Sequence, residues 1–425
     1  MSYIRILLLG GLALWTGCSA PTTIGYPAVS PDGKGFVSGG TSFLVWGFNY
    51  DRSVISGRDV LLEDVLREQP AKLDRDFAMM RRMGGNTVRL FCQMGEYFER
   101  PDHINAAAFE RLSMALDAAD RADLKVLLVG LCHIRKSTIP VWLVEADDDT
   151  VERHEELFWR QTAKRFRDHP AILAYDLQNE PAVHGSDSRD LVVGCFSMRG
   201  GEQFCYVHMH GRQASRRWAE WVHGRFGTEA AVRAAWKDYP RPGENWFSPA
   251  LPKTSREDPR LGDLLACHRD LLQAWAQRMR SAIRENDGNH LITVGALNPA
   301  VFADIVDFHC AHLYPKQDLT LEANEQAWRD HLSRLPPGKP IVVEEFYPLA
   351  YPHRADGQAA TATELIAAVR RAAGPHGAGF VSFYWGPAEE VIESPMGQAL
   401  YQNWLDAWSS AGRVASGTPS TTHSR

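Results

Sequence analysis

The chain has 425 residues, a formal net charge of −6, 44% hydrophobic residues and 23% charged residues, which is typical of a folded protein with a sizeable core. No basic run is long enough to indicate nucleic-acid binding, so no nucleic-acid partner is expected. The 13 Trp and 12 Tyr residues are numerous, and rings that do not pack in the core can stack on the apolar faces of sugars.

The first 17 residues are predicted to be a targeting segment rather than part of the fold. Arg5 precedes an apolar run at 6–15 that is too short to span a bilayer. The following Trp-Thr-Gly-Cys, ending at Cys18, resembles the box at which bacterial lipoproteins are lipidated, with ordinary secretory cleavage nearby as the alternative. We expect an exported chain, attached to a bacterial membrane (periplasmic or cell surface) only through a lipid on Cys18, with a linker over 18–39.

Export permits disulfide bonds, and two cysteines are candidates for one. Cys195 and Cys205 lie ten residues apart in a loop-like stretch, where a local disulfide is plausible. Cys92, Cys132 and Cys310 fall at or near predicted strand ends, where a small buried hydrophobic residue is the simpler interpretation. The chain has no C-x-x-C pair, which argues against a zinc site of that type.

From about residue 40, apolar runs alternate with amphipathic segments. The apolar runs predict eight strands, at 43–49, 86–91, 124–131, 171–178, 291–296, 305–311, 340–344 and 380–384. The amphipathic segments predict helices at 71–83, 106–122, 151–167, 264–285, 324–334, 362–373 and 397–408.

Near-continuous hydrophobic strands are typical of a parallel sheet that is covered on both faces. Eight β/α units therefore predict an α/β protein, a (β/α)8 TIM barrel over residues 40–408 with a long insertion after strand 4. A doubly wound sheet is the alternative, but no glycine-rich phosphate loop follows the first strand.

The insertion, residues 182–258, separates the fourth strand from its helix, where a few residues usually suffice. It contains helical patterns at 216–226 and 229–236. Because it leaves the carboxyl end of a barrel strand, we expect a substrate-binding subdomain, with structural padding as the alternative. The Ser/Thr/Gly-rich tail, residues 409–425, is predicted to be disordered.

Polar side chains follow nearly every predicted strand, at the end where barrels build active sites. They are Asn49, Arg89, His133, Asn179, Glu180, His312, Tyr314, Glu344, Glu345 and Trp385. Glu180 and Glu345 each end a buried strand, where a charge is costly unless it is paired or useful. Two carboxyl groups over one site are what glycoside hydrolysis requires, one protonated and one ionised.

In combination, Asn-Glu-Pro after strand four, His-x-Tyr on strand six, Glu-Phe on strand seven and Trp on strand eight resemble the retaining glycoside hydrolases of clan A. The resemblance is strongest to family 5, the cellulase and mannanase superfamily, and covers roughly residues 40–408. It implies that Glu180 is the general acid/base and Glu345 the nucleophile. Glu345 is favoured over Glu344 because the family's nucleophile directly precedes Phe. Since side chains alternate along a strand, we expect only one of these two to face the barrel mouth.

The resemblance also implies roles for the remaining polar residues. Arg89 would hold Glu345 ionised, and Tyr314 would hydrogen-bond the nucleophile. Asn179 would contact the sugar 2-hydroxyl and Trp385 would stack beneath the sugar. The other residues expected to contact substrate or shape its site are His133, His312 and Asn49. A buried ion pair for Arg89, a loop or core position for His133 and core packing for Trp385 remain alternatives.

No cofactor and no metal are expected. His309 and His312, with His208 and His210 of the insertion, are possible ligands by residue type. However, His309 and His312 would face opposite sides of a regular strand. The first strand also ends in Phe-Asn-Tyr, where barrel metallohydrolases carry a His pair.

The sequence therefore predicts a retaining β-glycoside hydrolase that acts on a β-linked polysaccharide or oligosaccharide of the mannan or glucan type. One alternative is a β-galactosidase-like exo-enzyme, because residues 225–236 are similar to a segment of β-galactosidases in the same clan. Another is a carbohydrate-binding barrel without catalysis. The sequence does not separate hydrolysis from transglycosylation, and it does not indicate an oligomeric state.

Overall fold

The computed structural model describes residues 25–101, 103–132, 140, 142, 146–181, 214–252, 258–348, 350–383, 385 and 395–415. The predictions for the targeting segment, for lipidation at Cys18, for the disulfide between Cys195 and Cys205 and for His133 lie outside these residues.

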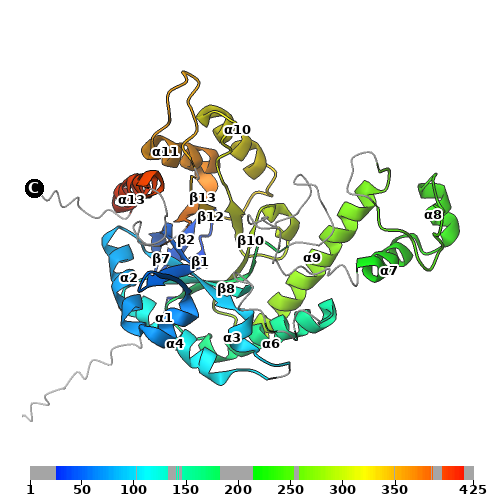
Figure 1. Ribbon diagram of the computed structural model, residues 1–425, viewed down its shortest axis with the longest axis horizontal. Coiled ribbons are helices and arrows are strands. Elements are labelled where there is room, and N and C mark those ends of the chain that lie inside the picture. The colour runs from blue at the N-terminus through cyan, green and yellow to red at the C-terminus, as the bar shows by residue number, and fades with distance from the viewer. Residues whose placement is uncertain are drawn as a thin grey trace, which may run out of the picture.

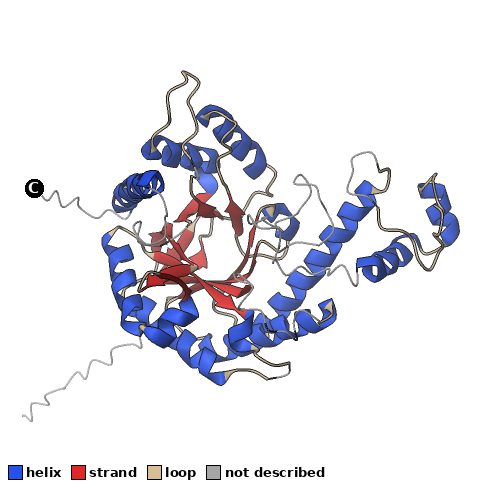
Figure 2. Ribbon diagram, viewed as in Figure 1, coloured by secondary structure: helices blue, strands red, loops and turns tan. Residues whose placement is uncertain are grey.

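Eight parallel strands close into a barrel, which confirms the predicted fold class (Figures 1 and 2). In order around the barrel they are β4 (Val45–Tyr50), β7 (Thr87–Gln93), β8 (Lys125–Cys132), β9 (Ile172–Asn179), β10 (Leu291–Ala296), β11 (His309–His312), β12 (Ile341–Phe346) and β13 (Gly377–Ser382), and β13 pairs with β4. The strand β11 begins later than predicted, because the 3₁₀ helix η2 (Pro299–Phe302) and a turn precede it.

Helices surround the barrel and cover its outer face (Figure 2). The helices that match predicted ones are α2 (Pro70–Arg82), α4 (Ala106–Arg121), α6 (Asp148–Phe166), α9 (Leu261–Arg284), α10 (Leu321–Leu332), α11 (Ala362–Ala373) and α13 (Pro395–Ala415). The helix α11 shows the local logic: Thr361 and Glu364 form a capping box at its start, and Leu365, Ile366 and Val369 are buried. Shorter elements are α1 (Leu62–Glu68), α3 (Met94–Tyr97), η3 (Gly374–His376) and the hairpin of β5 (Arg52–Ile55) and β6 (Arg58–Leu61).

The segment predicted as a linker over 18–39 is partly folded. The strands β1 (Ala28–Val29), β2 (Phe36–Ser38) and β3 (Thr41–Phe43) form a small antiparallel sheet. Phe36 packs edge-on against Phe308 at 5.0 Å, in a cluster with residues from the amino-terminal halves of several barrel strands. This sheet therefore covers the end of the barrel opposite the predicted site.

The tail prediction is wrong for its first residues, because α13 continues to Ala415. The extension is held by packing: Ser409 is buried and donates its hydroxyl to the carbonyl of Leu405 at 2.7 Å. A Cβ at position 412 would meet the indole of Trp46, so Gly412 permits this close approach.

The described part of the insertion forms two helices, α7 (Ala214–Phe226) and α8 (Glu229–Ala235), close to the predicted ranges. They lie beside the first turns of α9, outside the ring of helices around the barrel (Figure 1). Trp218 and Trp236 stack at 5.7 Å in a separate aromatic core. The described residues place no part of α7 or α8 at the barrel mouth. Among the described residues, no helix is long and apolar enough to cross a membrane.

Candidate active site

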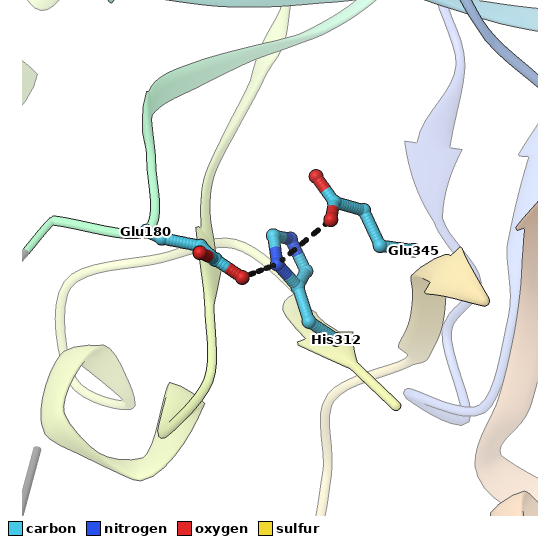
Figure 3. A group of neighbouring side chains, drawn as sticks. All are labelled: Glu180, His312 and Glu345. Atoms are coloured by element: carbon cyan, nitrogen blue, oxygen red, sulfur yellow. Dashed lines mark hydrogen bonds and ion pairs between the residues drawn. The ribbon is translucent and has the colours of Figure 1, made fainter. Parts of the chain in front are cut away.

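The structure brings Glu180, His312 and Glu345 together from three different strands (Figure 3). Glu180 directly follows β9, His312 ends β11, and Glu345 lies near the end of β12. One ring nitrogen of His312 and one carboxylate oxygen from each glutamate all lie within 4.8 Å of one another. All three side chains are buried. The two carboxyl groups therefore meet at the carboxyl end of the barrel.

Glu180 has an unusual backbone conformation, with φ 47°, in the left-handed region that residues other than Gly seldom adopt. Its N–H donates to the carbonyl of Gly295 on β10 at 2.7 Å, which holds the turn at the end of β9. Its Oε1 lies 2.7 Å from Nδ1 of His312. A strained residue with a well-anchored backbone is characteristic of functional sites.

Both oxygens of Glu345 face hydrogen-bond donors. Nη1 of Arg89 donates to Oε1 at 2.7 Å, and the hydroxyl of Tyr314 donates to Oε2 at 2.6 Å. Nδ1 of His312 lies 3.4 Å from Oε2. Burial raises the pKa of Glu345, while the positive charges of His312 and Arg89 and the hydrogen bond from Tyr314 oppose that rise. The donors thus aim the carboxylate and favour its ionised form.

Arg89 connects the residues of the site from beneath. Its Nε and Nη2 donate to Oδ2 of Asp176 at 3.0 and 2.6 Å. Nη1 also donates to Oδ1 of Asn49 at 3.0 Å, and Nη2 to Oδ1 of Asn179 at 2.9 Å. Because the Arg89 side chain is 0% exposed, it cannot contact a substrate and must act through Glu345.

Asn49 is likewise completely buried, so of its two expected roles it can shape the site but cannot contact a substrate. Its amide donates to the backbone carbonyls of Glu344 and Ser382 at 2.7 and 3.2 Å. It joins β4 to β12 and β13 and helps to position Arg89. Asn179, in contrast, is partly exposed at the end of β9 and lies beside Glu180.

Both Glu344 and Glu345 point into the barrel, although Glu344 is completely buried below the barrel mouth. Between β11 and β12 the register shifts from Ala311 opposite Val343 to His312 opposite Glu345. This irregularity turns both carboxylates inward: Oε1 of Glu344 lies 3.2 Å from Nε2 of His312, and Oε2 lies 3.4 Å from Nε of Arg89.

A buried layer of charge, formed by Arg89, Asp176 and Glu344, therefore lies below the two candidate catalytic carboxyls. Burial and then the negative charge of Glu344 raise the pKa of Asp176 to about 7. Burial would raise the pKa of Glu344, but Arg89 and His312 lower it below its usual range. Gly295 makes room for this layer, because a Cβ there would collide with the side chains of all three residues.

Three carboxyl groups surround His312, and their negative charges influence its protonation. Burial alone would lower its pKa, but Glu345, Glu180 and Glu344 together raise the pKa to about 10. These neighbouring carboxyl groups thus favour the imidazolium form of His312.

The donor atoms of Glu180, His312 and Glu345 would also suit a divalent cation by type and spacing. However, the guanidinium of Arg89 lies 2.7 Å from Glu345 and the imidazolium of His312 lies 2.7 Å from Glu180. Both carboxyl groups are therefore already engaged by positively charged side chains, which disfavours a cation at the same place. The arrangement is a hydrogen-bonded acid pair rather than a metal centre.

Trp385 follows β13 at the same end of the barrel and is 7% exposed. Its backbone N–H donates to the carbonyl of Asn49 at 2.7 Å, and its ring packs edge-on against Phe48 at 5.3 Å. Its indole N–H finds no acceptor among the described residues. Both the packing and the substrate-stacking interpretations are compatible with this position.

Two features of the site were not predicted from the sequence, the charge of Asp176 and the inward turn of Glu344. Asp176 did leave a signal, because it is a charged residue inside the apolar run at 171–177. The irregularity of β12 left none, because a register shift depends on the neighbouring strand.

Comparison with known proteins gives one family match. The family model "Cellulase (glycosyl hydrolase family 5)" matches residues 62–203, which is less than half of the chain. No curated protein matches. The family match confirms, over this segment, the predicted resemblance to family 5 and supports a glycosidase.

Solved structures share the fold at low sequence identity. An exo-beta-1,4-mannosidase from Opitutaceae bacterium strain TAV5 is 14% identical with a TM-score of 0.57, over 92% of this chain and 62% of that one. A beta-galactosidase from Bacillus circulans sp. alkalophilus is 12% identical with a TM-score of 0.61, over 86% of this chain and 55% of that one. A GH5_18 variant from Streptomyces cattleya, in complex with Manb1-4GlcNAc, is 16% identical with a TM-score of 0.54, over 90% of this chain and 82% of that one. The chain thus spans less than two thirds of the length of the first two structures, and the likeness concerns the barrel.

Proposed function

We propose that this protein is a retaining β-glycosidase in which Glu345 is the nucleophile and Glu180 the general acid/base. The observation that carries the proposal is the approach of the two carboxyl groups, with one oxygen of each within 4.8 Å of the other. Retaining glycosidases hold their carboxyl groups about 5–5.5 Å apart, whereas inverting enzymes need roughly 6.5–9.5 Å to admit a water molecule.

The surroundings of the two glutamates support different roles. Glu345 receives hydrogen bonds from Arg89 and Tyr314, which suit an anionic nucleophile. Glu180 does not accept these two hydrogen bonds. Its Oε1 instead lies 2.7 Å from Nδ1 of His312. The two carboxyl groups therefore have the unequal environments that the proposed acid and nucleophile roles require.

The reaction would proceed in two displacements. In the first, a carboxylate oxygen of Glu345 attacks the anomeric carbon, the glycosidic C–O bond breaks, and the leaving oxygen takes the proton of Glu180. In the second, ionised Glu180 takes a proton from water, the water oxygen attacks the anomeric carbon, and Glu345 leaves as a carboxylate. Two inversions return the β configuration.

For the substrate we propose a β-linked glycan or oligosaccharide, with a β-mannoside tested first. A mannosidase and a structure that holds a Manb1-4GlcNAc ligand are among the similar folds. The β-galactosidases are also among them, so galactosides belong in the same panel. As sugar contacts we propose Asn179, which is partly exposed beside Glu180, and Trp385.

The test is turnover of aryl β-mannosides, β-glucosides and β-galactosides by the wild type, Glu180→Ala and Glu345→Ala. For Glu180→Ala we expect a loss of about 10²–10⁴-fold with poor leaving groups and a much smaller loss with 2,4-dinitrophenol, because only a poor leaving group needs the acid. Azide should restore turnover and give the β-glycosyl azide.

Glu345→Ala serves as the matched control. Without the nucleophile, both leaving groups should lose turnover, and any product formed with azide should be the α-glycosyl azide. Equal losses on both leaving groups in Glu180→Ala would contradict the acid/base assignment. A wild type that binds oligosaccharides but turns over no member of the panel would show a carbohydrate-binding barrel instead.

A further inference from the structure

The proposed mechanism gives no role to Glu344, a fully buried carboxylate one residue before the proposed nucleophile. Burying a charge is costly unless it is paired, and replacing such a group with an apolar one is often neutral or stabilising. The fold nevertheless accommodates Glu344 with two special features: the irregular register of β12 and the absence of a side chain at Gly295. Both allow its carboxylate to reach His312 and Arg89.

The position of His312 between two carboxyl groups determines where protons can lie. Its Nδ1 is 2.7 Å from Oε1 of Glu180, and its Nε2 is 3.2 Å from Oε1 of Glu344 (Figure 3 shows the first contact). A neutral imidazole can donate from only one nitrogen, whereas an imidazolium donates from both. If Nδ1 lost its proton, it would accept the proton of Glu180, and that proton would then point at His312 instead of at the leaving group.

We propose that Glu344 is a positioning residue that keeps both nitrogens of His312 protonated, so that Nδ1–H holds Oε1 of Glu180 and the acid proton stays on Oε2. This inference rests on the proposed function, because it assigns Glu344 a part in protonating the leaving group. Glu344 itself is 0% exposed and does not touch the substrate. It acts through His312 on the acid, not on the reacting bond.

The charges around His312 favour this arrangement. The pKa of His312 is raised to about 10, with Glu345, Glu180 and Glu344 as the groups that raise it against burial. The pKa of Glu344 is lowered, as expected for a carboxylate that stays ionised beside Arg89 and His312. Titratable and charged groups from four strands and the turns after them surround this imidazole. The strand residues are Arg89 on β7, Asp176 on β9, Cys310 on β11, and Glu344 and Glu345 on β12. Glu180 follows β9 and Tyr314 follows β11.

The kinetic test uses Glu344→Gln, which keeps the shape of the side chain and removes its charge. The basic limb of the pH profile of kcat/KM should move to lower pH by about one unit, because His312 loses a neighbouring negative charge and gives up its second proton at lower pH. The loss of kcat/KM should be at least about tenfold greater with a poor leaving group than with 2,4-dinitrophenol, because the acid is the group affected.

Asp176→Asn is the matched control, since Asp176 belongs to the same buried layer and bonds Arg89 but not His312. The loss of kcat/KM in Asp176→Asn should be similar for the poor leaving group and for 2,4-dinitrophenol. In a His312→Asn background, Glu344→Gln should cause no further shift of the basic limb. Glu344→Gln losses that are equal for both leaving groups, with an unmoved basic limb, would overturn the proposal.

A second measurement does not depend on turnover. In ¹⁵N-histidine NMR of the wild type, with the His312 signal assigned through His312→Asn, both ring nitrogens should remain protonated at pH 8. In Glu344→Gln the same signal should titrate at lower pH. A neutral His312 at pH 8 in the wild type would overturn the inference even if the enzyme is a glycosidase. If the wild type shows no turnover, the proposed function is refuted. The NMR titration of His312 would then still show whether both of its ring nitrogens are protonated.

Discussion

At the scale of single residues, the site depends on how positive and negative charges are balanced without water. Arg89 is completely buried and contacts Asp176, Glu344 and Glu345 at once. An arginine suits this place because its planar guanidinium offers five donors in fixed directions and remains charged. The arrangement depends on geometry as well as charge, because each carboxylate contacts a different nitrogen of the guanidinium at its shortest distance.

Gly295 tests that geometry directly. In Gly295→Ala the new methyl group would meet Glu344, Arg89 and Asp176, whose ion pairs would have to separate. We expect a stability loss of about 2–4 kcal/mol, in the range for disrupting a buried network, and a loss of kcat/KM of at least about 100-fold. Urea unfolding and turnover of an aryl β-glycoside measure the two effects.

Gly288→Ala is the control, because a Cβ there meets no neighbouring atom. It should remain close to the wild type in both measurements. If Gly295→Ala also retains wild-type turnover, the tight packing of the charged layer is not needed for the activity.

At the scale of elements, the irregular end of β12 and the outlying helices α7 and α8 depart most from a regular barrel. In β12 the register shift brings the carboxylate of Glu344 into the site. In α7 and α8 the departure produces a small unit with its own core, joined to the barrel through α6 and α9. Arg217 on α7 makes an ion pair of 2.8 Å with buried Glu152 on α6, and Glu152 also pairs with Arg278 on α9 at 2.6 Å.

Arg260, at the start of α9, is central to this outlying unit. It is 0% exposed, pairs with buried Glu244 and lies 4.5 Å from the ring of Trp236. Arg260→Met should lower the stability of the unit by about 3–5 kcal/mol, because Glu244 would be left buried without its partner. Hydrogen exchange should rise in α7 and α8 and remain low in the barrel strands.

Arg233→Met is the matched control, because Arg233 lies on α8 in an exposed pair with Glu229. Such surface pairs contribute about 0–1 kcal/mol, so its exchange should resemble that of the wild type. Faster exchange throughout the barrel in Arg260→Met would mean that the outlying unit and the barrel unfold together.

At the scale of the whole molecule, buried titratable groups give stability a definite dependence on pH. Burial raises the pKa of Glu63 and of Glu155 to about 8, and that of Asp176 to about 7. The folded chain then holds protons that the unfolded chain releases near pH 4, so stability falls as pH rises from about 4.5 to 8. The raised pKa of His312 changes stability in the same direction, but at higher pH. Its contribution to the free energy of unfolding is complete below about pH 6.5 and is lost as pH rises through about 10.

Glu63→Gln isolates one part of this dependence. Oε1 of Glu63 accepts the backbone N–H of Gln93 at 2.8 Å, and Gln can accept the same bond without a charge. Relative to the wild type, the variant should gain stability between pH 5 and 8, by at most about 1.4 kcal/mol per pH unit, and should differ little below pH 4.5. Chemical unfolding at pH 4.5, 6 and 8 measures this.

Glu68→Gln is the control for Glu63→Gln, because Glu68 lies on the same helix in an exposed pair with Arg58. Its stability should follow the wild type at all three pH values. A constant offset between Glu63→Gln and the wild type would show that Glu63 has no elevated pKa in the folded chain.

The sequence by itself determined the type and order of the barrel elements, because apolar runs and helical periodicity are local consequences of which faces are buried. It also indicated the residues at the strand ends, since parallel strands in a closed barrel deliver their carboxyl ends to one rim. The tertiary structure decided how those residues meet. Glu344 turns inward because β12 slips against β11, Asn49 is sealed between strands, and α7 and α8 lie outside the helical ring. These features depend on contacts between residues distant in the chain, and no local pattern records the register of one strand against another.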